Sequence, residues 1–350
     1  MRFTIVTPSY NQLDWLELCI ASVRDQIATK SETGNLILSE GKVKEWQGEK
    51  VVRREGGGRV AAVPLTVEHI VKDAGTPGIE EFARRLGADF YRDGEAAAEG
   101  NAKVGTWKGG NVERKGYSLT IYSEKDAGMY DAINKGLRQA SGDICAYLNC
   151  DEQYLPGTLG WVADYFSVST ETEVLFGAAI VTRADGSYVC DRRVMVPTRW
   201  HTMVSGNLSI FTSSTFFRRK SVVERGLLFD PQWRVCGDAV WALRFLEAGL
   251  RMEATHKPLS SFAETGVNMS ASGNPRAAEE GRRLALSAPT AARAFKPAVL
   301  LAYRFRRWLS GAYALTPHKY EVFTAENAQE RRSFEVNEPD FRWQMGTEKI

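Results

Sequence analysis

The chain lacks the features that mark membrane-spanning and nucleic-acid-binding proteins. Its 350 residues carry 45 Lys and Arg against 43 Asp and Glu, so the formal net charge is only +2. Binding to a phosphate backbone normally needs a concentrated basic surface, and we therefore expect no nucleic-acid partner. Long hydrophobic runs are missing too, because the longest purely apolar stretch near the C-terminus, residues 298–303, is far too short to cross a bilayer.

Cysteine is scarce and irregularly spaced. There are five cysteines, an odd number, and no two of them form a CxxC pair. This argues against a disulfide framework or a cysteine zinc site, and we expect reduced thiols. The N-terminus enters strand-like sequence at once, without the basic and apolar segments of a leader. We therefore expect a cytoplasmic protein. The alternative is a peripheral protein bound at the inner face of the membrane.

What the chain does contain is a regular alternation of strand and helix patterns over its first 160 residues. Four stretches are expected as strands, at residues 3–7, 67–72, 119–122 and 144–148, and the last of them is fully apolar. Apolar side chains at helical spacing follow each of the first three runs. Repeated strand-helix-strand units predict an α/β fold, with a mostly parallel, Rossmann-like sheet flanked by helices.

After residue 156 the pattern becomes mixed. Residues 174–190 predict two strands joined by a tight turn. Further elements are expected as a strand at 209–217, a helix at 239–248 and a strand at 252–262. We predict one domain at residues 1–265, followed by a helical, basic C-terminal extension and tail at 266–350.

Two segments interrupt the alternation. Residues 28–66 and 92–116 are polar and glycine-rich, and connections of this length are usually lids or mobile insertions. In the C-terminal extension, a helix starting at Pro297 would align apolar side chains on one face, flanked by arginines. Such a stripe more often packs on its own domain, which is what we expect here. The alternative is an interfacial helix, in which residues 297–312 contact the membrane near a lipid-linked acceptor.

The residues with most chemical meaning lie between 123 and 157. A predicted helix there is followed by a buried strand, and Asp151 and Glu152 come directly after it. Two adjacent carboxylates at a buried strand end are costly unless a cation compensates them. Mg²⁺ or Mn²⁺ would do so and would also bridge diphosphate oxygens. An ordinary solvent-exposed loop is the competing interpretation of the same acidic pair.

Three further residues are ambiguous on local sequence alone. Asp73 ends a predicted strand, where it can meet a ribose or stabilise its own turn. Asp238 opens a predicted helix, where it can act as a general base or as a helix cap. Lys135 lies off the apolar stripe of its helix, as a solvated lysine would.

Taken together, these stretches resemble the inverting family 2 glycosyltransferases of the GT-A fold. The likeness covers roughly residues 3–262 and is carried by four ordered stretches, TIVTPSYNQLDWLELCIASVRDQ, VEHIVKDAGTPGIEEFARR, SEKDAGMYDAINKGLRQASGDICAYLNCDE and STFFRRKSVVERGLLFDPQWRVCGDAVWALRFLEAG. The third stretch is the most specific, since it follows the family pattern E-x-D-x-G-x-Y-D-A-x-N-K-G. The resemblance implies the GT-A architecture and a sugar-transfer site.

The resemblance also implies a role for each matching acid. Asp151 and Glu152 fall on the metal-binding acids of the family, so the implied cofactor is Mg²⁺ or Mn²⁺. Asp238 falls on the catalytic base. Glu124 and Asp126 fall on the rim of the active site.

Four other positions fall on the nucleotide side of the family's site. Thr7, Pro8 and Asp73 match residues that cradle the base and ribose, and Lys135 lies where the rim approaches the nucleotide. The turn DAGTPG after Asp73 departs from the family's usual Ser-Thr-Asp, and Glu152 stands where the family usually has Asp. These departures leave the identity of the nucleotide and the reach of the second metal acid open.

The implied activity is transfer of a single sugar from a nucleotide-sugar donor, most often a UDP-sugar, to a hydroxyl of a glycan or lipid-linked acceptor. This places the enzyme in polysaccharide biosynthesis. The Q-x-x-R-W signature of processive synthases is absent, which favours single-sugar transfer. Two alternatives are a non-catalytic binding protein on a degenerate glycosyltransferase scaffold and a nucleotidyltransferase. The latter typically needs a glycine-rich phosphate loop, which TPSYNQ is not.

Overall fold

The computed structural model describes residues 1–28, 44–46, 49–51, 65–92, 116–205, 208–266, 268 and 274–343. The two expected insertions, at 28–66 and 92–116, therefore lie largely outside the described residues. Within the first of them the structure describes a short antiparallel pair of strands, β2 (Lys44–Trp46) and β3 (Glu49–Val51).

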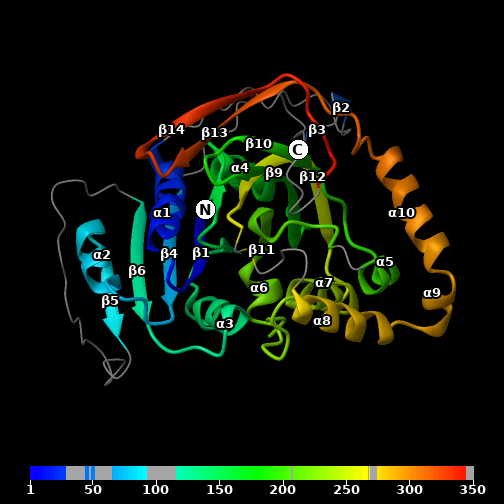
Figure 1. Ribbon diagram of the computed structural model, residues 1–350, viewed down its shortest axis with the longest axis horizontal. Helices are drawn as coiled ribbons and strands as arrows, with labels where there is room; N and C mark the ends of the chain where they lie inside the picture. Colours follow the sequence, from blue (N-terminus) through cyan, green and yellow to red (C-terminus); the bar gives the residue numbers. More distant parts are fainter. Residues whose placement is uncertain are drawn as a thin grey trace.

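A large mixed sheet organises the described part of the chain (Figure 1). Its strands follow the order β5-β6-β4-β1-β7-β11-β9-β12-β8, and β10 pairs with β9 at its side. The first half is parallel and consists of β1 (Arg2–Ser9), β4 (Thr66–Asp73), β5 (Asp89–Arg92), β6 (Tyr117–Ser123) and β7 (Ile144–Tyr147). The second half is mixed and consists of β8 (Glu152–Tyr154), β9 (Val174–Arg183), β10 (Tyr188–Arg192), β11 (Thr215–Arg218) and β12 (Met252–Glu264).

The parallel strands end together at one edge of the sheet. Ser9 of β1 lies opposite Asp73 of β4, and Asp73 lies opposite Ser123 of β6. This register follows from the strand-helix-strand repeats that the sequence predicts. It brings the segments after β1, β4, β6 and β7 to the same edge, which is where open α/β sheets bind their ligands.

Apolar side chains cover both faces of the central strands. Phe3 and Ile5 of β1 pack on one face with α1 (Leu13–Ala28) and α4 (Thr158–Val168). Val6 packs on the other face with α3 (Met129–Gln139) and α7 (Gly237–Glu247). Successive side chains of a strand point to opposite faces, so a strand that is apolar throughout requires helices on both. The remaining helix of this half, α2 (Ile79–Leu86), packs beside β4 and β6.

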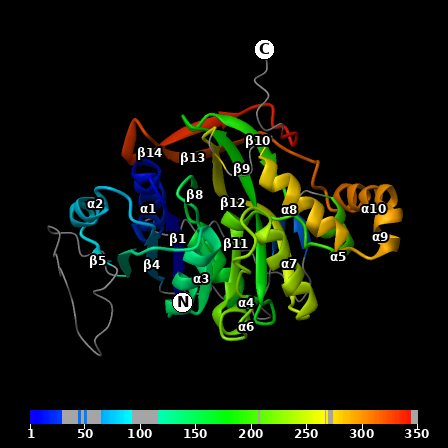
Figure 2. The ribbon, with the colours of Figure 1, turned by 60° about the horizontal axis from the view of Figure 1, so that its bottom comes forward.

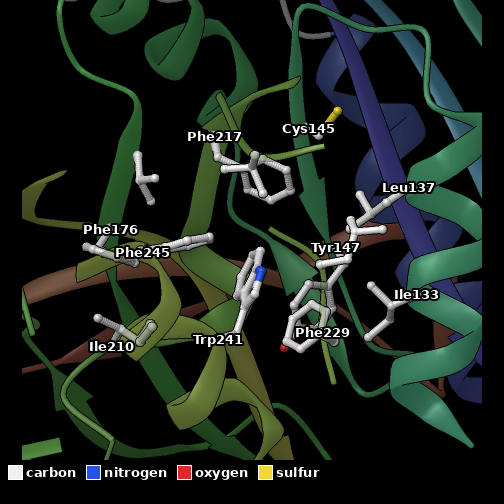
Figure 3. Packing of buried hydrophobic residues seen from close by; sticks show 14 of the residues in the cluster. Ile133, Leu137, Cys145, Tyr147, Phe176, Ile210, Phe217, Phe229, Trp241 and Phe245 are labelled. Atoms are coloured by element: carbon white, nitrogen blue, oxygen red, sulfur yellow. The ribbon is translucent and has the colours of Figure 1, made fainter. Parts of the chain in front are cut away.

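The core on the α7 side is built around Trp241. Its ring stacks on Phe229 with centroids 4.3 Å apart and meets Phe245 at 4.4 Å (Figure 3). The indole Nε1 donates a hydrogen bond to the carbonyl of Leu227 at 2.7 Å, so burial leaves no indole donor unpaired. This packing fixes α7, and with it Asp238 in the first turn of that helix.

The connections between β10 and α7 differ from expectation in one place. The sequence predicts a strand over 209–217, whereas the structure has a 3₁₀ turn, η1 (Thr212–Ser214), before the short β11. The buried hydroxyl of Ser214 donates to the carbonyl of Ala178 at 2.8 Å, which holds this turn against β9. The short helices α5 (Arg199–Val204) and α6 (Arg219–Val222) flank the segment.

The C-terminal extension begins with the expected helices, α8 (Pro275–Leu286), α9 (Thr290–Ala294) and α10 (Lys296–Leu309). Beyond them, the expected polar tail instead contains a hairpin of β13 (His318–Thr324) and β14 (Asn327–Val336). The hairpin returns to the first helix, where Phe323 packs on Leu18 of α1. Arg331 reinforces this contact through an ion pair with Asp25 at 2.8 Å.

The apolar stripe on α10 does not pack on the domain, so our expectation there was wrong. Leu301, Phe305, Trp308 and Leu309 remain 67%, 55%, 64% and 64% exposed. The helix packs through its other face, where Tyr303 stacks on His201 of α5 with ring centroids 3.5 Å apart. Among the described residues, none of the helices has both the length and the apolar character needed to cross a membrane.

Candidate active site

A cavity of about 1290 Å³ opens where β1 and β7 end, between the sheet edge and the first turn of α7. Its wall includes five of the residues that the sequence singled out, Pro8, Asp126, Asp151, Glu152 and Asp238. The structure therefore brings together acids that lie more than 80 residues apart in sequence. The other four, Thr7, Asp73, Glu124 and Lys135, are not part of this wall.

Asp151 and Glu152 lie just beyond the end of β7, and each is held by an asparagine. Asp151 Oδ2 accepts a hydrogen bond from Asn268 Nδ2 at 2.7 Å, and Glu152 Oε2 accepts one from the backbone N–H of Asn149 at 2.7 Å. Desolvation raises the pKa of both carboxyls, and the charge of Asp151 raises the pKa of Glu152 further. The pair thus forms a site whose charged form needs a compensating cation.

The side chains after β7 include oxygen donors of the kind that a hard cation takes. Considering only the described residues, no cluster of three or more His, Cys, Asp or Glu side chains is arranged to hold a metal ion. A third oxygen donor is nevertheless present, because Asn149 Oδ1 is buried without a hydrogen-bond partner and Asn149 lines the cavity. Two carboxylates and an amide oxygen are the ligand types that Mg²⁺ and Mn²⁺ prefer, so these residues fit such an ion. The sequence analysis did not single out Asn149.

Asp238 projects from the first turn of α7 into the same cavity. Its Oδ1 accepts a hydrogen bond from the backbone N–H of Ala239 at 2.8 Å, and its own N–H donates to the hydroxyl of Tyr130 at 3.2 Å. Tyr130 in turn donates to the carbonyl of Val235 at 3.0 Å. Desolvation raises the pKa of Asp238 to about 6, and the charge of Glu280 acts in the same direction. The side chain is thus a carboxylate at neutral pH with an affinity for protons well above that of an ordinary aspartate.

The loop before Asp238 is anchored from the C-terminal extension. Glu280 of α8 accepts three backbone hydrogen bonds, from Arg234 at 2.8 Å and from Val235 and Cys236 at 2.9 Å each. Its side chain is almost fully buried, and α8 packs on α7 (Figure 2). Nothing in the local sequence of α8 marks this contact, since Glu280 looks like one of many surface glutamates on an amphipathic helix.

Position 237, next to Asp238, must be a glycine because the ring of Tyr130 packs directly against it. A Cβ atom at this position would collide with the ring of Tyr130, because the backbone passes directly over that ring. The close approach is what allows the N–H of Asp238 to reach the Tyr130 hydroxyl. Tyr130, from the Y-D-A-x-N-K-G stretch, therefore shapes the position of Asp238 from 108 residues away.

Asp73 and Thr7 are buried beneath the nucleotide side that the sequence predicts. Asp73 Oδ1 accepts from the backbone N–H groups of Gly75 and Thr76 at 2.9 and 2.7 Å, and its Oδ2 accepts from the Thr76 hydroxyl at 2.6 Å. The carboxylate is thus engaged in its own turn, which was the competing interpretation of this residue. Thr7 Oγ1 lies 2.9 Å from Nε2 of the buried His69. Both side chains shape the strand ends, and neither faces the cavity.

The rim residues brace the loop between β6 and α3. Glu124 forms an ion pair with Lys72 at 2.9 Å. Lys135 Nζ donates to the carbonyl of Lys125 at 2.6 Å, and Asp126 Oδ1 accepts from the N–H of Gly128 at 2.7 Å. Of the two predicted rim residues, Asp126 lines the main cavity and Glu124 does not.

Part of the cavity wall is aromatic and basic, and the sequence analysis did not single out its aromatic residues. Trp343, from the tail, lines it together with Arg192, whose guanidinium lies 5.6 Å from the indole ring. Trp343 also packs near Phe211 and Phe262, with ring centroids 5.8 and 5.6 Å away. These residues come from four separated segments, so only the folded chain brings them together.

A sequence comparison matches part of the chain to a known protein family. The sequence model of the family described as "Glycosyl transferase family 2" matches residues 116–226, which contain α3 and the acids after β7. No curated protein matches the chain.

Solved structures that align with most of this chain do so at low sequence identity and with TM-scores below 0.5. TarS from S. aureus is 14% identical, with 88% of this chain and 44% of TarS covered and a TM-score of 0.48, so this chain spans less than half of that protein. TarS 1–349 in complex with UDP-GlcNAc is 13% identical, with coverages of 88% and 73% and a TM-score of 0.49. The mannosyltransferase PcManGT from Pyrobaculum calidifontis, in complex with GDP-Man and Mn²⁺, is 15% identical, with coverages of 87% and 82% and a TM-score of 0.43.

Proposed function

We propose that this chain is a family 2 glycosyltransferase of the GT-A fold, because the family model matches residues 116–226, and that it transfers a single sugar with inversion. The donor is a nucleotide-sugar, with a UDP-sugar as the first candidate, and the acceptor is a hydroxyl of a glycan or of a lipid-linked acceptor. Such an enzyme would serve polysaccharide biosynthesis in the cytoplasm.

One observation carries this proposal. The acids after β7 and the acid that opens α7 line the same cavity, whose volume of 1290 Å³ is ample for a nucleotide-sugar. A sugar-transfer site needs a place for the leaving diphosphate and a base for the incoming hydroxyl, within reach of one anomeric carbon. Asp151 and Asp238 offer these two functions from separate elements.

The residues after β7 are assigned to the diphosphate. Asn149, Asp151 and Glu152 would hold a divalent cation through their side-chain oxygens. When bound, Mg²⁺ or Mn²⁺ would neutralise the charge that develops on the leaving nucleoside diphosphate. Asn268 keeps Asp151 in place through its amide, and the backbone of Asn149 does the same for Glu152.

Asp238 is assigned as the general base. Its carboxylate would take the proton of the acceptor hydroxyl while the hydroxyl oxygen attacks the anomeric carbon and the bond to the diphosphate breaks. Attack from the face opposite the leaving group inverts the configuration at that carbon. A pKa of about 6 suits the role, because the group is ionised at neutral pH and still a better base than an ordinary aspartate.

The nucleotide is assigned to the ends of β1 and β4. Pro8 would contact it directly, because it lines the cavity. Thr7 and Asp73 would act from beneath, by fixing the strand end and the turn that follows. Lys135 and the rim acids would act by bracing the loop over the nucleotide, as the bond from Lys135 to the Lys125 carbonyl suggests.

Release of nucleoside diphosphate tests the proposal without knowledge of the acceptor. The full chain would be incubated with UDP-, dTDP- and GDP-sugars, with Mn²⁺ or with a chelator, and the released diphosphate measured. We expect release from one nucleotide class, dependent on the metal and strongly reduced in Asp151→Asn. If the protein binds a nucleotide-sugar but never releases the diphosphate, with or without added glycan extracts, the non-catalytic alternative holds instead.

A further inference from the structure

The apolar stripe of α10 is unusual because nothing in the described structure covers it. Leu301, Phe305, Trp308 and Leu309 recur at helical spacing and are each more than half exposed. Phe305 and Trp308 stack on one another with ring centroids 5.7 Å apart, so they form one continuous surface. Phe295, just before the helix, adds a further ring that is 63% exposed.

The outward direction of this stripe is fixed by the opposite face of the helix. Tyr303 stacks on His201 of α5, and Arg307 is buried with its guanidinium 5.1 Å from the ring of Tyr313. These anchors leave the stripe pointing away from the domain. Both views of the ribbon place α9 and α10 at one edge of the molecule, across the sheet from α2 (Figures 1 and 2).

The sequence segment that contains the stripe carries charge of one sign only. From residue 281 to residue 320 the sequence contains no Asp or Glu, and its cationic residues are Arg282, Arg283, Arg293, Lys296, Arg304, Arg306, Arg307 and Lys319. The protein as a whole has a net charge of only +2, so this concentration is a local feature. Arg293, Lys296 and Arg304 are exposed beside the apolar stripe.

The apolar stripe and the cations beside it together indicate what kind of surface α10 binds. Aromatic and leucine side chains in one row, flanked by exposed cations, match the boundary between acyl chains and anionic headgroups of a lipid surface. A second copy of the chain fits poorly, because a two-fold contact would set the same cationic segment against itself without acids to offset it.

We propose that α10 docks the protein on an anionic lipid surface, with Leu301, Phe305, Trp308 and Leu309 entering the headgroup region. α10 packs against α5, and α5 contributes Thr202 and Met203 to the wall of the main cavity. Docking through α10 would therefore place the cavity close to the membrane, with α5 forming the wall on that side. Resting on the proposed function, this selects a lipid-borne glycan as the acceptor.

Co-sedimentation with vesicles tests the proposal on the full chain. Vesicles of phosphatidylcholine alone would be compared with vesicles that also contain phosphatidylglycerol. An apolar variant would combine Leu301→Ser, Phe305→Ser, Trp308→Ser and Leu309→Ser. A charge variant would combine Arg293→Gln, Lys296→Gln and Arg304→Gln. Its matched control would combine Arg84→Gln, Arg92→Gln and Arg251→Gln, three exposed cations elsewhere in the chain.

We expect the wild type and the control to bind the anionic vesicles and bind pure phosphatidylcholine weakly. The apolar variant and the charge variant should each bind the anionic vesicles about tenfold or more weakly than the wild type. Metal-dependent release of nucleoside diphosphate from a soluble donor, measured without vesicles, should stay unchanged in all variants. Its absence in the wild type would count against the proposed function and leave the vesicle result standing.

Two outcomes would overturn the docking proposal. The first is equal vesicle binding by the wild type and the apolar variant. The second is a wild-type protein that does not bind vesicles and is a dimer by light scattering, while the apolar variant is a monomer. The stripe would then be an interface between two copies of the chain.

Discussion

Replacing Glu280 by alanine should loosen the loop that carries Asp238 and slow the reaction without weakening donor binding. The Glu280 carboxylate accepts three backbone hydrogen bonds from residues 234–236 and is almost fully buried. None of its partners belongs to the strand-end acids or to the ends of β1 and β4. The nucleotide side of the cavity should therefore keep its geometry when this anchor is removed.

The magnitude follows from the three bonds. A hydrogen bond to a charged group contributes about 1.5–3 kcal/mol, and three bonds that share one acceptor are far from additive. Water can reach the freed N–H groups, because residues 234–236 are partly exposed. We therefore expect Glu280→Ala to lower the free energy of unfolding by about 2–4 kcal/mol. A base displaced by about 1 Å should lower kcat by about a hundredfold.

The assay combines denaturant unfolding with diphosphate release at saturating donor. Glu279→Ala is the matched control, because Glu279 is the exposed neighbour on the same helix. Glu280→Gln is informative as well, since it removes a negative charge that raises the pKa of Asp238. Any activity it retains should persist to lower pH than in the wild type. The reasoning fails if Glu280→Ala is as active as Glu279→Ala, or if the loss lies entirely in KM for the donor.

Further predictions concern the base and its surroundings. Because the pKa of Asp238 is about 6, diphosphate release should rise as pH increases through 6 and then level off, and a flat rate from pH 5 to 7 would contradict this. Asp238→Asn should raise Tm at pH 7, where the native carboxyl is charged at a cost, and the gain should shrink as pH falls through about 6 and vanish by about pH 3, where Asp238 is protonated in both the folded and the unfolded state. Gly237→Ala should collide with Tyr130 and lower kcat with little change in donor affinity, measured by steady-state kinetics. Asn268→Ala should raise the Mn²⁺ concentration needed for half-maximal activity several-fold, and unchanged metal dependence would count against its support of Asp151.

The sheet and its helices could be predicted because their patterns are local. The apolar run of β7 and the helical spacing in α3 lie in short windows, and the structure confirms both. The acids after β7 were found for the same reason, since a carboxylate at the end of a buried strand is visible in a few residues. Their convergence with Asp238 on one cavity has no such local sign, because α7 follows β11, which is antiparallel to β7.

The missed residues depend on contacts that no short window contains. Glu280 acts on a loop some 45 residues earlier, and Trp343 reaches the cavity only because the hairpin returns across α1. Asp73 was visible in the sequence, but its role was not. A carboxylate at the end of a strand can bind a ribose or accept hydrogen bonds from the following turn, and in the structure it accepts them from that turn. The stripe on α10 could not be assigned from periodicity, because an amphipathic helix has the same pattern whether its apolar face is covered or open.

The central claim is that Asp238 takes the proton of the acceptor while the acids after β7 hold the diphosphate. It is tested most directly by one variant measured in two ways, Asp238→Asn assayed for sugar transfer and for donor binding by calorimetry with Mn²⁺ present. We predict that transfer falls by at least about a thousandfold while the donor Kd stays within about threefold of the wild type. Transfer at the wild-type rate, or a loss of donor binding as large as the loss of transfer, would contradict the assignment.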